Sequence, residues 1–324
     1  MSDSLLDIAD LRVRFGTGTE AVRGISLTVR RGETHCLVGE SGCGKSVTAL
    51  AVMNLLARGG QRSASRMTLR GTDLLPLSER AISRLRGDVM GMIFQEPMTS
   101  LNPAYTVGSQ MSEVYRRHRG ASQRQALDRA ADLLGRVGIT APGLRLAQYP
   151  HQLSGGLRQR VMIAMALMCE PALLIADEPT TALDVTVQAQ ILRLLLELQR
   201  ELGLAILLIT HDLGVVARMA HRVSVMYAGE IIEHATAADL FAAPTHPYTR
   251  GLLECVPIPG RVRRDQPLGS IPGTVPRITA GFAGCAFRAR CAHAVPDCAV
   301  AVPRKSRSSG HDYLCRLPAD WVGA

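Results

Sequence analysis

The chain has 324 residues, of which 47% are hydrophobic, so it can bury a substantial core and is neither disordered nor of low complexity. No apolar run approaches the roughly 18 residues that a membrane helix needs, and Met1 to Asp10 carry acids where a signal peptide has a basic and then an apolar region. The net charge of +9 suits anionic partners, although a solvated arginine-rich surface is the simpler explanation. We therefore expect a soluble, cytoplasmic protein that meets a membrane only through partners.

Residues 5–256 alternate apolar strands with amphipathic helices, which predicts a mainly parallel sheet wrapped by helices. We expect strands at 34–38, 173–176 and 205–209, and helices at 45–56, 122–137, 157–169 and 185–201. Closely spaced prolines follow, at Pro257, Pro259, Pro267, Pro272 and Pro276. Proline at this density prevents long helices and central strands, so residues 257–324 are predicted to form an extended linker and a small irregular unit.

The first predicted strand is followed by a glycine-rich stretch, Gly39-Glu40-Ser41-Gly42-Cys43-Gly44-Lys45-Ser46, which opens a helix. This strand-to-helix context is the one that a phosphate-binding loop requires, and a chance glycine-rich turn fits it poorly. Glycines let the backbone curl so that successive N–H groups and the helix N-terminus face the phosphates. We expect Lys45 to reach the β- and γ-phosphates of a nucleotide and the Ser46 hydroxyl to ligate Mg²⁺.

The second predicted strand ends in two adjacent carboxylates, Asp177 and Glu178. Side chains alternate in direction along a strand, so neighbouring acids can do different tasks. Asp177 is expected to orient Mg²⁺ and its water, and Glu178 to polarise the attacking water. On its own, an Asp-Glu pair after an apolar run more often belongs to a solvated loop. Together with a phosphate loop, it is the expected second half of a nucleotide site.

A third motif, Leu153-Ser154-Gly155-Gly156, begins a predicted helix. In isolation it indicates a serine N-cap and nothing more. Exposed N–H groups at a glycine-rich helix start also form an anion site, however. Because the chain already has one phosphate loop, this second site suggests that ATP is held from two sides.

With these three motifs, residues 5–256 resemble the nucleotide-binding subunit of ATP-binding cassette (ABC) transporters. The Leu-Ser-Gly-Gly signature is the specific marker, since many other P-loop ATPases share the first two motifs but lack it. The resemblance implies an α/β fold with a P-loop NTPase (RecA-like) core, an antiparallel β subdomain and a helical signature subdomain at about residues 96–170. A small, irregular, cysteine-rich C-terminal extension would follow at 257–324.

The resemblance also implies roles for residues around the nucleotide. Phe15 matches the aromatic that stacks on adenine, although an ordinary core phenylalanine is an equal alternative, and the ATP-binding loop extends from Gly39 through Val47. Gln95 would touch Mg²⁺ and the catalytic water, and His211 the γ-phosphate. Cys43 stands where many members have serine, and its thiol could make the site sensitive to oxidation.

In this family two cassettes pair head to tail across their nucleotides. The phosphate loop of one subunit would then be capped by the signature of the other, contributed by Ser154, Gly155, Gly156 and Gln159. Asp184, in Ala182-Leu183-Asp184, matches the loop that crosses the dimer interface. The resemblance therefore implies a second cassette, most simply a paralogue, as partner.

A narrower resemblance, over nearly the full length, is to the ATPase subunits of dipeptide and oligopeptide importers. It is carried by the runs Phe94 to Pro103, Tyr149 to Gly156, Asp177 to Thr186 and His246-Pro247-Tyr248-Thr249. The expected partners are then two transmembrane permeases and an extracytoplasmic binding protein, at the cytoplasmic face of the membrane. Nickel-importer ATPases share much of this pattern, so the cargo stays open between peptides and nickel.

Two other classes of ATPase fit the sequence less well. A non-transport cassette protein acting on nucleic acid or ribosomes would suit the basic charge, but such proteins usually carry two cassettes or a long coiled-coil insertion, and the sequence shows neither, so no nucleic acid is expected. A nucleotide binder without turnover is disfavoured because Glu178 and His211 are both present. We therefore expect an ATPase coupled to transport.

Four of the eight cysteines, Cys285, Cys291, Cys298 and Cys315, fall in the C-terminal stretch. Their spacing lacks the C-x₂-C pairs of structural zinc sites, but a metal held by four thiolates would cross-link a segment that has little core of its own. The extension of peptide-importer ATPases resembles this stretch cysteine for cysteine, and some members hold a [4Fe–4S] cluster there. The resemblance thus implies such a cluster, with zinc or free thiols as alternatives. His293 and His311 are weaker ligand candidates and are expected at the surface.

Overall fold

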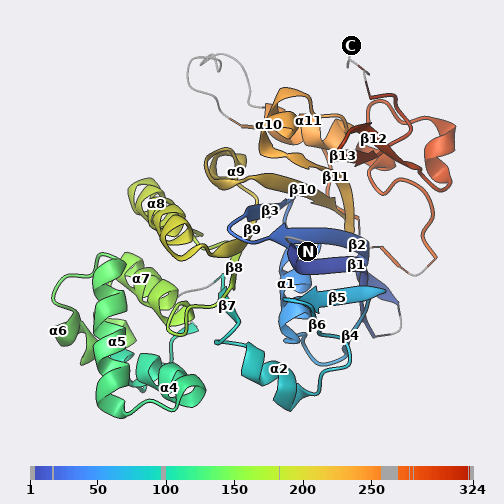
Figure 1. Ribbon diagram of the computed structural model, residues 1–324. Coiled ribbons are helices and arrows are strands. Elements are labelled where there is room, and N and C mark those ends of the chain that lie inside the picture. The colour runs from blue at the N-terminus through green and yellow to red at the C-terminus, as the bar shows by residue number, and fades with distance from the viewer. Residues whose placement is uncertain are drawn as a thin grey trace. The chain divides into compact units, whose positions relative to one another are not determined.

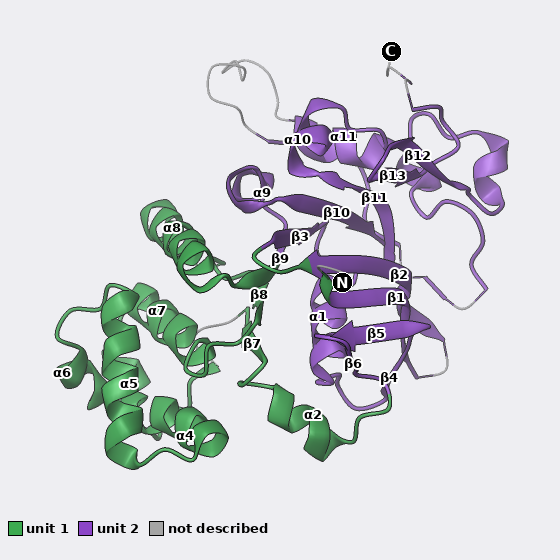
Figure 2. Cartoon of the chain, viewed as in Figure 1, with its two compact units in different colours: residues 1–5, 30–32, 76–208 green, residues 6–29, 33–75, 209–324 purple. Residues whose placement is uncertain are grey.

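The computed structural model describes residues 4–16, 18–95, 100–181, 183–256, 269–276, 278–279, 281–319 and 321 (Figure 1). Part of the predicted linker, 257–268, lies outside the described residues, as do Ala182 and the first four residues of the predicted helical subdomain, 96–99. The chain divides into two compact units (Figure 2). Unit 1 comprises residues 1–5, 30–32 and 76–208, and unit 2 comprises residues 6–29, 33–75 and 209–324.

Unit 2 begins with an antiparallel sheet of strand order β2-β1-β5-β6, in which β4 also pairs with β1. The bounds of these strands are β1 Ser4–Phe15, β2 Thr19–Arg30, β4 Gly60–Ser63, β5 Arg66–Leu69 and β6 Thr72–Asp73. Buried and more exposed residues alternate along most of β1, as expected for a strand with one face on a core. This sheet is the antiparallel β subdomain that the sequence predicts.

The second run of strands in unit 2 has the order β12-β13-β11-β10-β3. Its elements are β3 Thr34–Val38, α1 Lys45–Met53, α9 Leu213–Met219, β10 Arg222–Tyr227, β11 Glu230–Thr236, α10 Ala237–Ala242 and α11 Pro247–Glu254. β3 and β10 pair in parallel, and all five residues of β3 are buried, which is typical of a central parallel strand. The predicted strand at 34–38 is therefore confirmed, and it leads into α1.

Unit 1 combines short parallel strands with helices (Figure 2). Its elements are α2 Glu79–Leu85, β7 Met90–Ile93, α4 Val107–Arg119, α5 Gln123–Arg136, α6 Pro142–Leu146, η1 Pro150–Gln152, α7 Gly155–Ala166, β8 Leu173–Asp177, α8 Val185–Leu202 and most of β9 Ala205–Thr210. β7 and β8 pair in parallel, and helices α4 to α7 pack on one another around buried residues such as Met111 and Leu134. These helices fall within the predicted helical subdomain.

Local signals at the helix ends explain why some helices begin or end at other residues than predicted. Side chains cap the starts of α7 and α5, and a left-handed residue ends α1. Ser154 accepts a hydrogen bond from the Leu157 N–H, so α7 starts at Gly155, two residues before the predicted 157. Ser122 and Gln125 form a capping box at the start of α5. α1 stops at Met53, earlier than predicted, because Asn54 adopts a left-handed φ of 55°.

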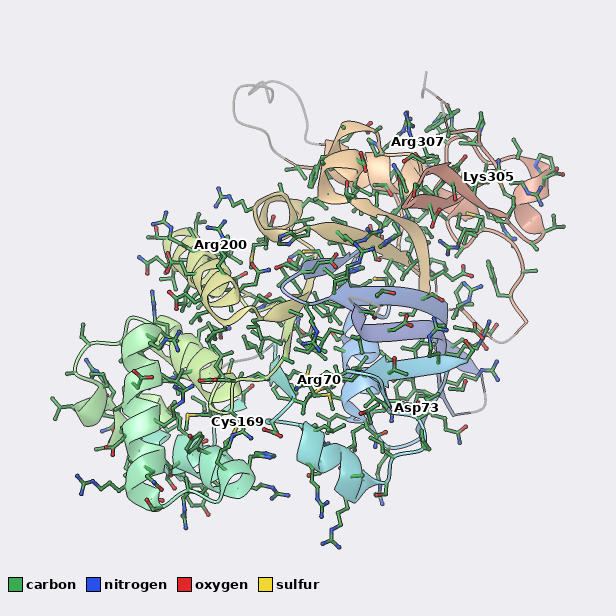
Figure 3. All side chains as sticks on the ribbon, in the orientation of Figure 1. Arg70, Asp73, Cys169, Arg200, Lys305 and Arg307 are labelled. Carbon is green, nitrogen blue, oxygen red and sulfur yellow. The ribbon has the colours of Figure 1, made fainter. Side chains whose placement is uncertain are left out.

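The C-terminal extension contains two short 3₁₀ helices, η2 Arg288–Arg290 and η3 Pro296–Ala299, and a hairpin of β12 Arg304–Ser308 and β13 His311–Leu314. β13 pairs antiparallel with β11, where Glu233 lies opposite Tyr313. Lys305 lies on β12 (Figure 3). Its ammonium donates to the Arg316 and Leu317 carbonyls at 2.7 and 3.2 Å, on the chain that follows β13. Sequence analysis did not predict this hairpin, because β12 is an uninterrupted polar run without alternation.

No helix within the described ranges is long and apolar enough to cross a membrane.

Candidate functional site

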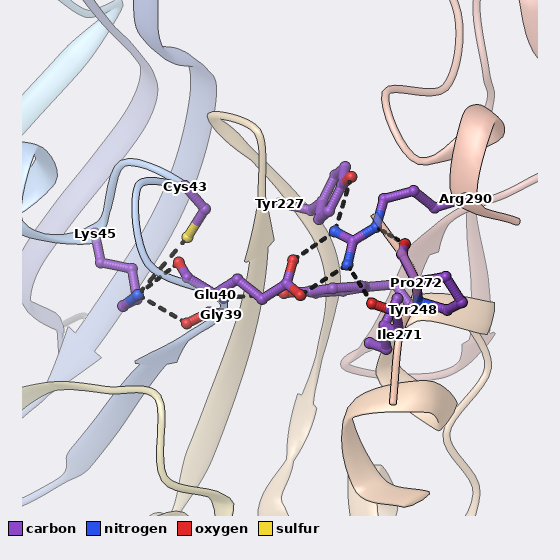
Figure 4. Close-up of polar contacts among 9 residues, drawn as sticks. All are labelled: Gly39, Glu40, Cys43, Lys45, Tyr227, Tyr248, Ile271, Pro272 and Arg290. Carbon is purple, nitrogen blue, oxygen red and sulfur yellow. Dashed lines mark hydrogen bonds and ion pairs between the residues drawn. The ribbon is translucent and has the colours of Figure 1, made fainter. Parts of the chain in front are cut away.

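The glycine-rich loop of unit 2 joins the buried end of β3 to the start of α1. Gly44 has φ 110°, and a Cβ placed there would lie 2.4 Å from the Ala21 carbonyl oxygen, so only glycine fits this position. The Lys45 ammonium is almost fully buried and donates to the carbonyls of Gly39 and Glu40 at 2.7 and 2.9 Å (Figure 4). A cation enclosed by a curled backbone beside a helix N-terminus has the chemistry of a phosphate site.

The remaining loop residues differ in their accessibility. Ser41 and Gly42 are exposed, whereas Ser46 and Val47, in the first turn of α1, are half-buried. Cys43 is buried, with its Sγ 3.9 Å from the Lys45 Nζ. Burial raises the pKa of the Cys43 thiol, although the Lys45 charge opposes this shift. A buried, protonated thiol is poorly reactive, which argues against the predicted sensitivity to oxidation.

Two further predicted residues lie in unit 2. Phe15 ends β1 opposite Gly60 of β4 and is half-buried, and its stacking on adenine stays a prediction. His211 directly follows β9 and is exposed. The next residue, Asp212, fixes the turn after it by accepting hydrogen bonds from the Gly214 and Val215 N–H groups that open α9.

The acidic loop lies in unit 1, where β8 ends at the buried Asp177. The next residue, Glu178, has φ 46°, a left-handed conformation that non-glycine residues rarely adopt. Its Oε2 accepts hydrogen bonds from the Gln95 Nε2 at 3.2 Å and the Thr181 Oγ1 at 2.9 Å. The predicted pair Gln95 and Glu178 is thus brought together, while Thr181 is a partner that sequence analysis missed. Strain of this kind is typical of functional sites.

The signature residues fall into two groups. Ser154 and Gly155 are exposed at the N-terminus of α7, where they are accessible to a second molecule. Gln159 is instead buried, and its amide donates to the carbonyl of Pro179, the residue after Glu178. Gln159 therefore lies in contact with the acidic loop of its own chain.

Two other positions of the predicted dimer surface have local partners. Gly156 approaches α8 so closely that a Cβ would meet a Val187 methyl at 3.0 Å. Asp184 is exposed and caps α8 by accepting the Val187 N–H at 2.9 Å. The sequence pattern at both positions therefore also serves the packing of unit 1.

The four C-terminal cysteines line one cavity in unit 2, with an empty volume of about 320 Å³ that is partly open to solvent. Its wall also includes His246, at the start of α11, and His293. The Cys285 N–H donates to the Cys298 carbonyl at 2.8 Å, which closes the loop that carries the first three cysteines. Residues that are up to thirty positions apart in sequence thus converge on one space.

The four thiols that line this cavity are the donor type that a thiolate-held cation needs, but their arrangement is not that of a metal site. Burial, followed by the neighbouring thiols, raises the pKa of Cys285 to about 11, and burial also raises the pKa of Cys291 and Cys315. A bound cation would offset this cost of ionising the thiols. Within the part of the chain that the structure describes, however, no group of three or more His, Cys, Asp or Glu side chains has the arrangement of a metal site. The cluster therefore remains a prediction.

His311 is not at the surface as predicted. It is buried on β13, and its Nε2 lies 2.8 Å from the Oε1 of the buried Glu233 on β11. Glu233 also accepts the backbone N–H groups of Thr245 and His246. Burial by itself would raise the pKa of Glu233, but these hydrogen bonds outweigh it and lower the pKa. The expectation failed because a histidine in a polar hairpin has no sequence signal of burial.

The chain matches two families of known proteins. Residues 22–181 match the family described as ABC transporter, and residues 232–298 match the one described as oligopeptide/dipeptide transporter, C-terminal region. Among curated relatives, a putative peptide import ATP-binding protein of Brucella melitensis is 52% identical over 95% of both chains. The dipeptide transport ATP-binding protein DppD of Escherichia coli is 47% identical over 99% of this chain and 98% of its own.

Solved structures agree with this assignment. The cbiO1 subunit of an ABC transporter complex from Clostridium perfringens has a TM-score of 0.65 at 30% identity, covering 74% of this chain and 92% of its own. A dimeric ATP-binding cassette in a post-hydrolysis state, bound to ADP and Pi, has a TM-score of 0.64 at 26% identity and covers 72% of this chain and 98% of its own. The phosphate loop, acidic loop and signature, together with relatives this similar over nearly the whole length, make this chain a member of the ABC transporter family of ATPases.

Proposed function

We propose that this chain is the ATP-hydrolysing subunit of an ABC importer that takes up dipeptides or oligopeptides. The single observation that carries the proposal is the position of Glu178, strained at the end of a buried strand and held by hydrogen bonds from Gln95 and Thr181. A fixed carboxylate in that position can accept a proton from an attacking water. Lys45 supplies the matching cation for the phosphates of ATP.

Mg²⁺, when bound with ATP, would neutralise phosphate charge that develops during hydrolysis. Ser46, Gln95 and Asp177 carry the oxygen ligands that this ion prefers, and we assign them to it. His211, exposed after β9, is assigned to the γ-phosphate. Ser154 and Gly155 are accessible for capping the nucleotide of a second cassette.

The peptide cargo and the partners are supported by the names of the relatives. Proteins that are about half identical over nearly the whole chain are named for peptide import and dipeptide transport. We infer an assembly at the cytoplasmic face of the membrane, with two permeases, a substrate-binding protein and a second cassette that is a paralogue. A nickel importer of the same branch is the alternative cargo assignment.

The experiment is reconstitution of the chain with two permeases, a binding protein and a second cassette of a peptide importer. We expect Mg²⁺-dependent ATP hydrolysis that rises when the binding protein is loaded with a dipeptide, and uptake of labelled dipeptide into the vesicles. The chain alone should hydrolyse ATP poorly, because its signature and phosphate loop serve different nucleotides. Stimulation by Ni²⁺ and not by peptides would replace the peptide assignment by nickel. Full hydrolysis by a strict monomer would refute the proposal that two cassettes pair around the nucleotides.

For the C-terminal cavity we propose a [4Fe–4S] cluster held by Cys285, Cys291, Cys298 and Cys315. The support is the convergence of all four thiols on one cavity in an extension with few buried side chains of its own. When bound, such a cluster supplies a rigid four-point cross-link, which is a structural role that needs no electron transfer.

Iron analysis of protein purified without oxygen tests this site. We expect a brown protein with about four irons per chain. Cys291→Ser should lose both colour and iron, whereas the matched variant Cys255→Ser, at a half-buried cysteine outside the cavity, should keep them. One zinc in a colourless protein would replace the cluster by a structural zinc site. Protein without any metal would refute the proposal.

A further inference from the structure

The second residue of the phosphate loop, Glu40, is bound by an arginine from the C-terminal extension (Figure 4). Arg290 Nη1 lies 2.6 Å from Glu40 Oε2, and Arg290 Nη2 lies 2.9 Å from Glu40 Oε1. The two residues are 250 positions apart in sequence. The Arg290 side chain is only 6% exposed and that of Glu40 is 29% exposed. Two parallel N–H···O bonds between a planar guanidinium and a carboxylate form a strong and geometrically specific pair.

The guanidinium is itself fixed by groups around it. Its Nε donates to the Pro272 carbonyl at 2.7 Å, and its Nη2 donates to the Ile271 carbonyl at 2.9 Å. Its Nη1 also lies 3.3 Å from the Tyr227 hydroxyl. An arginine with this many partners loses little further freedom when it binds a carboxylate. The side chain is therefore pre-organised to receive Glu40.

A second bond holds the backbone of the same residue. The Glu40 N–H donates to the Tyr248 hydroxyl of α11 at 2.9 Å. Phe287, beside the cysteine cavity, packs edge-on against the rings of Tyr248 and Tyr227 with centroid distances of 5.3 Å. The Glu40 carbonyl accepts a hydrogen bond from the Lys45 ammonium. The carboxylate, the N–H and the carbonyl of Glu40 therefore all have partners.

The charge of Glu40 explains why this contact matters. A carboxylate in a loop that binds phosphates would repel them and compete for the ammonium of Lys45, and in a partly buried site such effects are larger than in water. Figure 4 shows the carboxylate of Glu40 directed toward Arg290 and away from Lys45. Arg290 both neutralises this negative charge and keeps it away from the lysine.

We propose that Arg290 is a positioning residue for the nucleotide, acting through Glu40 on the phosphate loop. This inference rests on the proposed ATP binding, and it adds that the C-terminal extension contributes to the affinity for ATP. The extension thereby sets the affinity for ATP without touching the nucleotide. Cys291 follows Arg290 directly, so the fold around the cysteines delivers the guanidinium to the loop.

The experiment measures equilibrium binding of a fluorescent ATP analogue to the full chain, and ATP hydrolysis by the assembled transporter. The main variant is Arg290→Gln, which keeps a polar side chain but removes the positive charge and the guanidinium fork. We expect its Kd to rise about tenfold, equivalent to ~1.4 kcal/mol, while kcat at saturating ATP stays within about twofold of the wild type. Arg290→Lys, which keeps the charge and loses the fork, should fall between the two.

The decisive comparison places the same substitution in a Glu40→Gln background. Without the carboxylate there is no charge to neutralise, so Arg290→Gln should then change Kd by less than about threefold. Arg307→Gln is the matched control, because that exposed arginine of β12 binds only the Ala319 carbonyl among the described contacts. It should leave the Kd unchanged.

The outcomes separate this inference from the proposed function. A wild type that binds no nucleotide refutes the proposed function itself. If the wild type binds ATP and Arg290→Gln binds it equally well, the positioning role is refuted. An equal loss of affinity in both backgrounds also refutes it, because the effect would then come from the fold of the extension and not from Glu40.

Discussion

The phosphate loop and the acidic loop are held in place in different ways. The carboxylate of Glu178 is bound by Gln95 and Thr181, which belong to the same compact unit, and Thr181 is only three residues away. The phosphate loop is instead held through Glu40, whose N–H donates to the Tyr248 hydroxyl and whose carboxylate accepts from Arg290, 208 and 250 positions away. If these loops act as proposed, we expect catalysis and nucleotide affinity to depend on different parts of the chain, so that each can be changed without the other.

The largest expected effect is a loss of ATP hydrolysis without a loss of ATP affinity. Glu178→Gln keeps the size of the side chain and removes its basicity, so kcat for ATP hydrolysis should fall by about 10²–10⁴-fold. The affinity for ATP should be retained and a closed dimer should accumulate, because the phosphate loop is untouched. Turnover is measured in the assembled transporter and dimer formation by size-exclusion chromatography with ATP. Turnover like that of the wild type would contradict the role of Glu178.

Acid should act on the unit that carries the phosphate loop. In unit 2, His35 and His234 share the Ser224 hydroxyl, and their rings stack at 5.5 Å. Burial and then the charge of the other histidine lower the pKa of His35 to about 3. The pKa of His234 is lowered to about 4, first by burial and then by the Arg222 guanidinium. Arg222 Nη2 lies 2.8 Å from the His234 Nε2. The charge of Asp312 opposes this shift only in part.

The sign of the pH effect follows from these directions. Between about pH 6.5 and pH 4 the unfolded chain binds protons that the folded chain does not, so stability is complete above this window and is lost as the pH falls through it. Each histidine should weaken the fold by up to about 2 kcal/mol between pH 6.5 and pH 5. Hydrogen exchange should show protection lost around β3 and β10 first, and His35→Gln should reduce the pH dependence. Earlier loss around α4 to α7 would contradict the expectation.

The smallest effects come from removing one hydroxyl at each loop. Tyr248→Phe deletes the acceptor of the Glu40 N–H, so Kd for ATP should rise about 3–10-fold with little change in kcat. Thr181→Val deletes a donor to Glu178, so kcat should fall by a similar factor with little change in Kd. The two variants serve as controls for each other. If both changed the same parameter, the two loops would not be held independently.

The sequence predicted those parts of the molecule in which short motifs determine the backbone. Gly44 and Lys45 follow a buried strand, and this local order suffices to identify the loop and the helix after it. Predicted strands at 173–176 and 205–209 appear as β8 and β9 because each is a short, uninterrupted apolar run. The helix at 185–201 appears as α8 because its apolar residues recur at helical spacing. The family assignment rested on the same motifs and is confirmed by the relatives.

Contacts between residues far apart in sequence could not be predicted in this way. Arg290 is one of many arginines in the chain and has no pattern that marks it as the partner of Glu40. His311 was expected at the surface because its neighbours are polar, yet pairing of β13 with β11 carries it to Glu233. Gln159 was assigned to the signature that caps the nucleotide of a second cassette, which stays a prediction, and no sequence pattern indicated that its amide donates to the Pro179 carbonyl. In each case the partner is set by tertiary packing.

The hairpin of β12 and β13 also affects how the protein behaves at high concentration. β12 is the last strand of its run, and a terminal strand exposes unpaired backbone groups that can recruit the sheet of another molecule. Here that strand carries Arg304, Lys305 and Arg307, and such charges discourage edge-to-edge association. Without the hairpin, the more apolar β11 would become the terminal strand. We therefore expect the extension to keep the sheet from associating with other molecules, and shortened versions of this chain that lack the hairpin to aggregate.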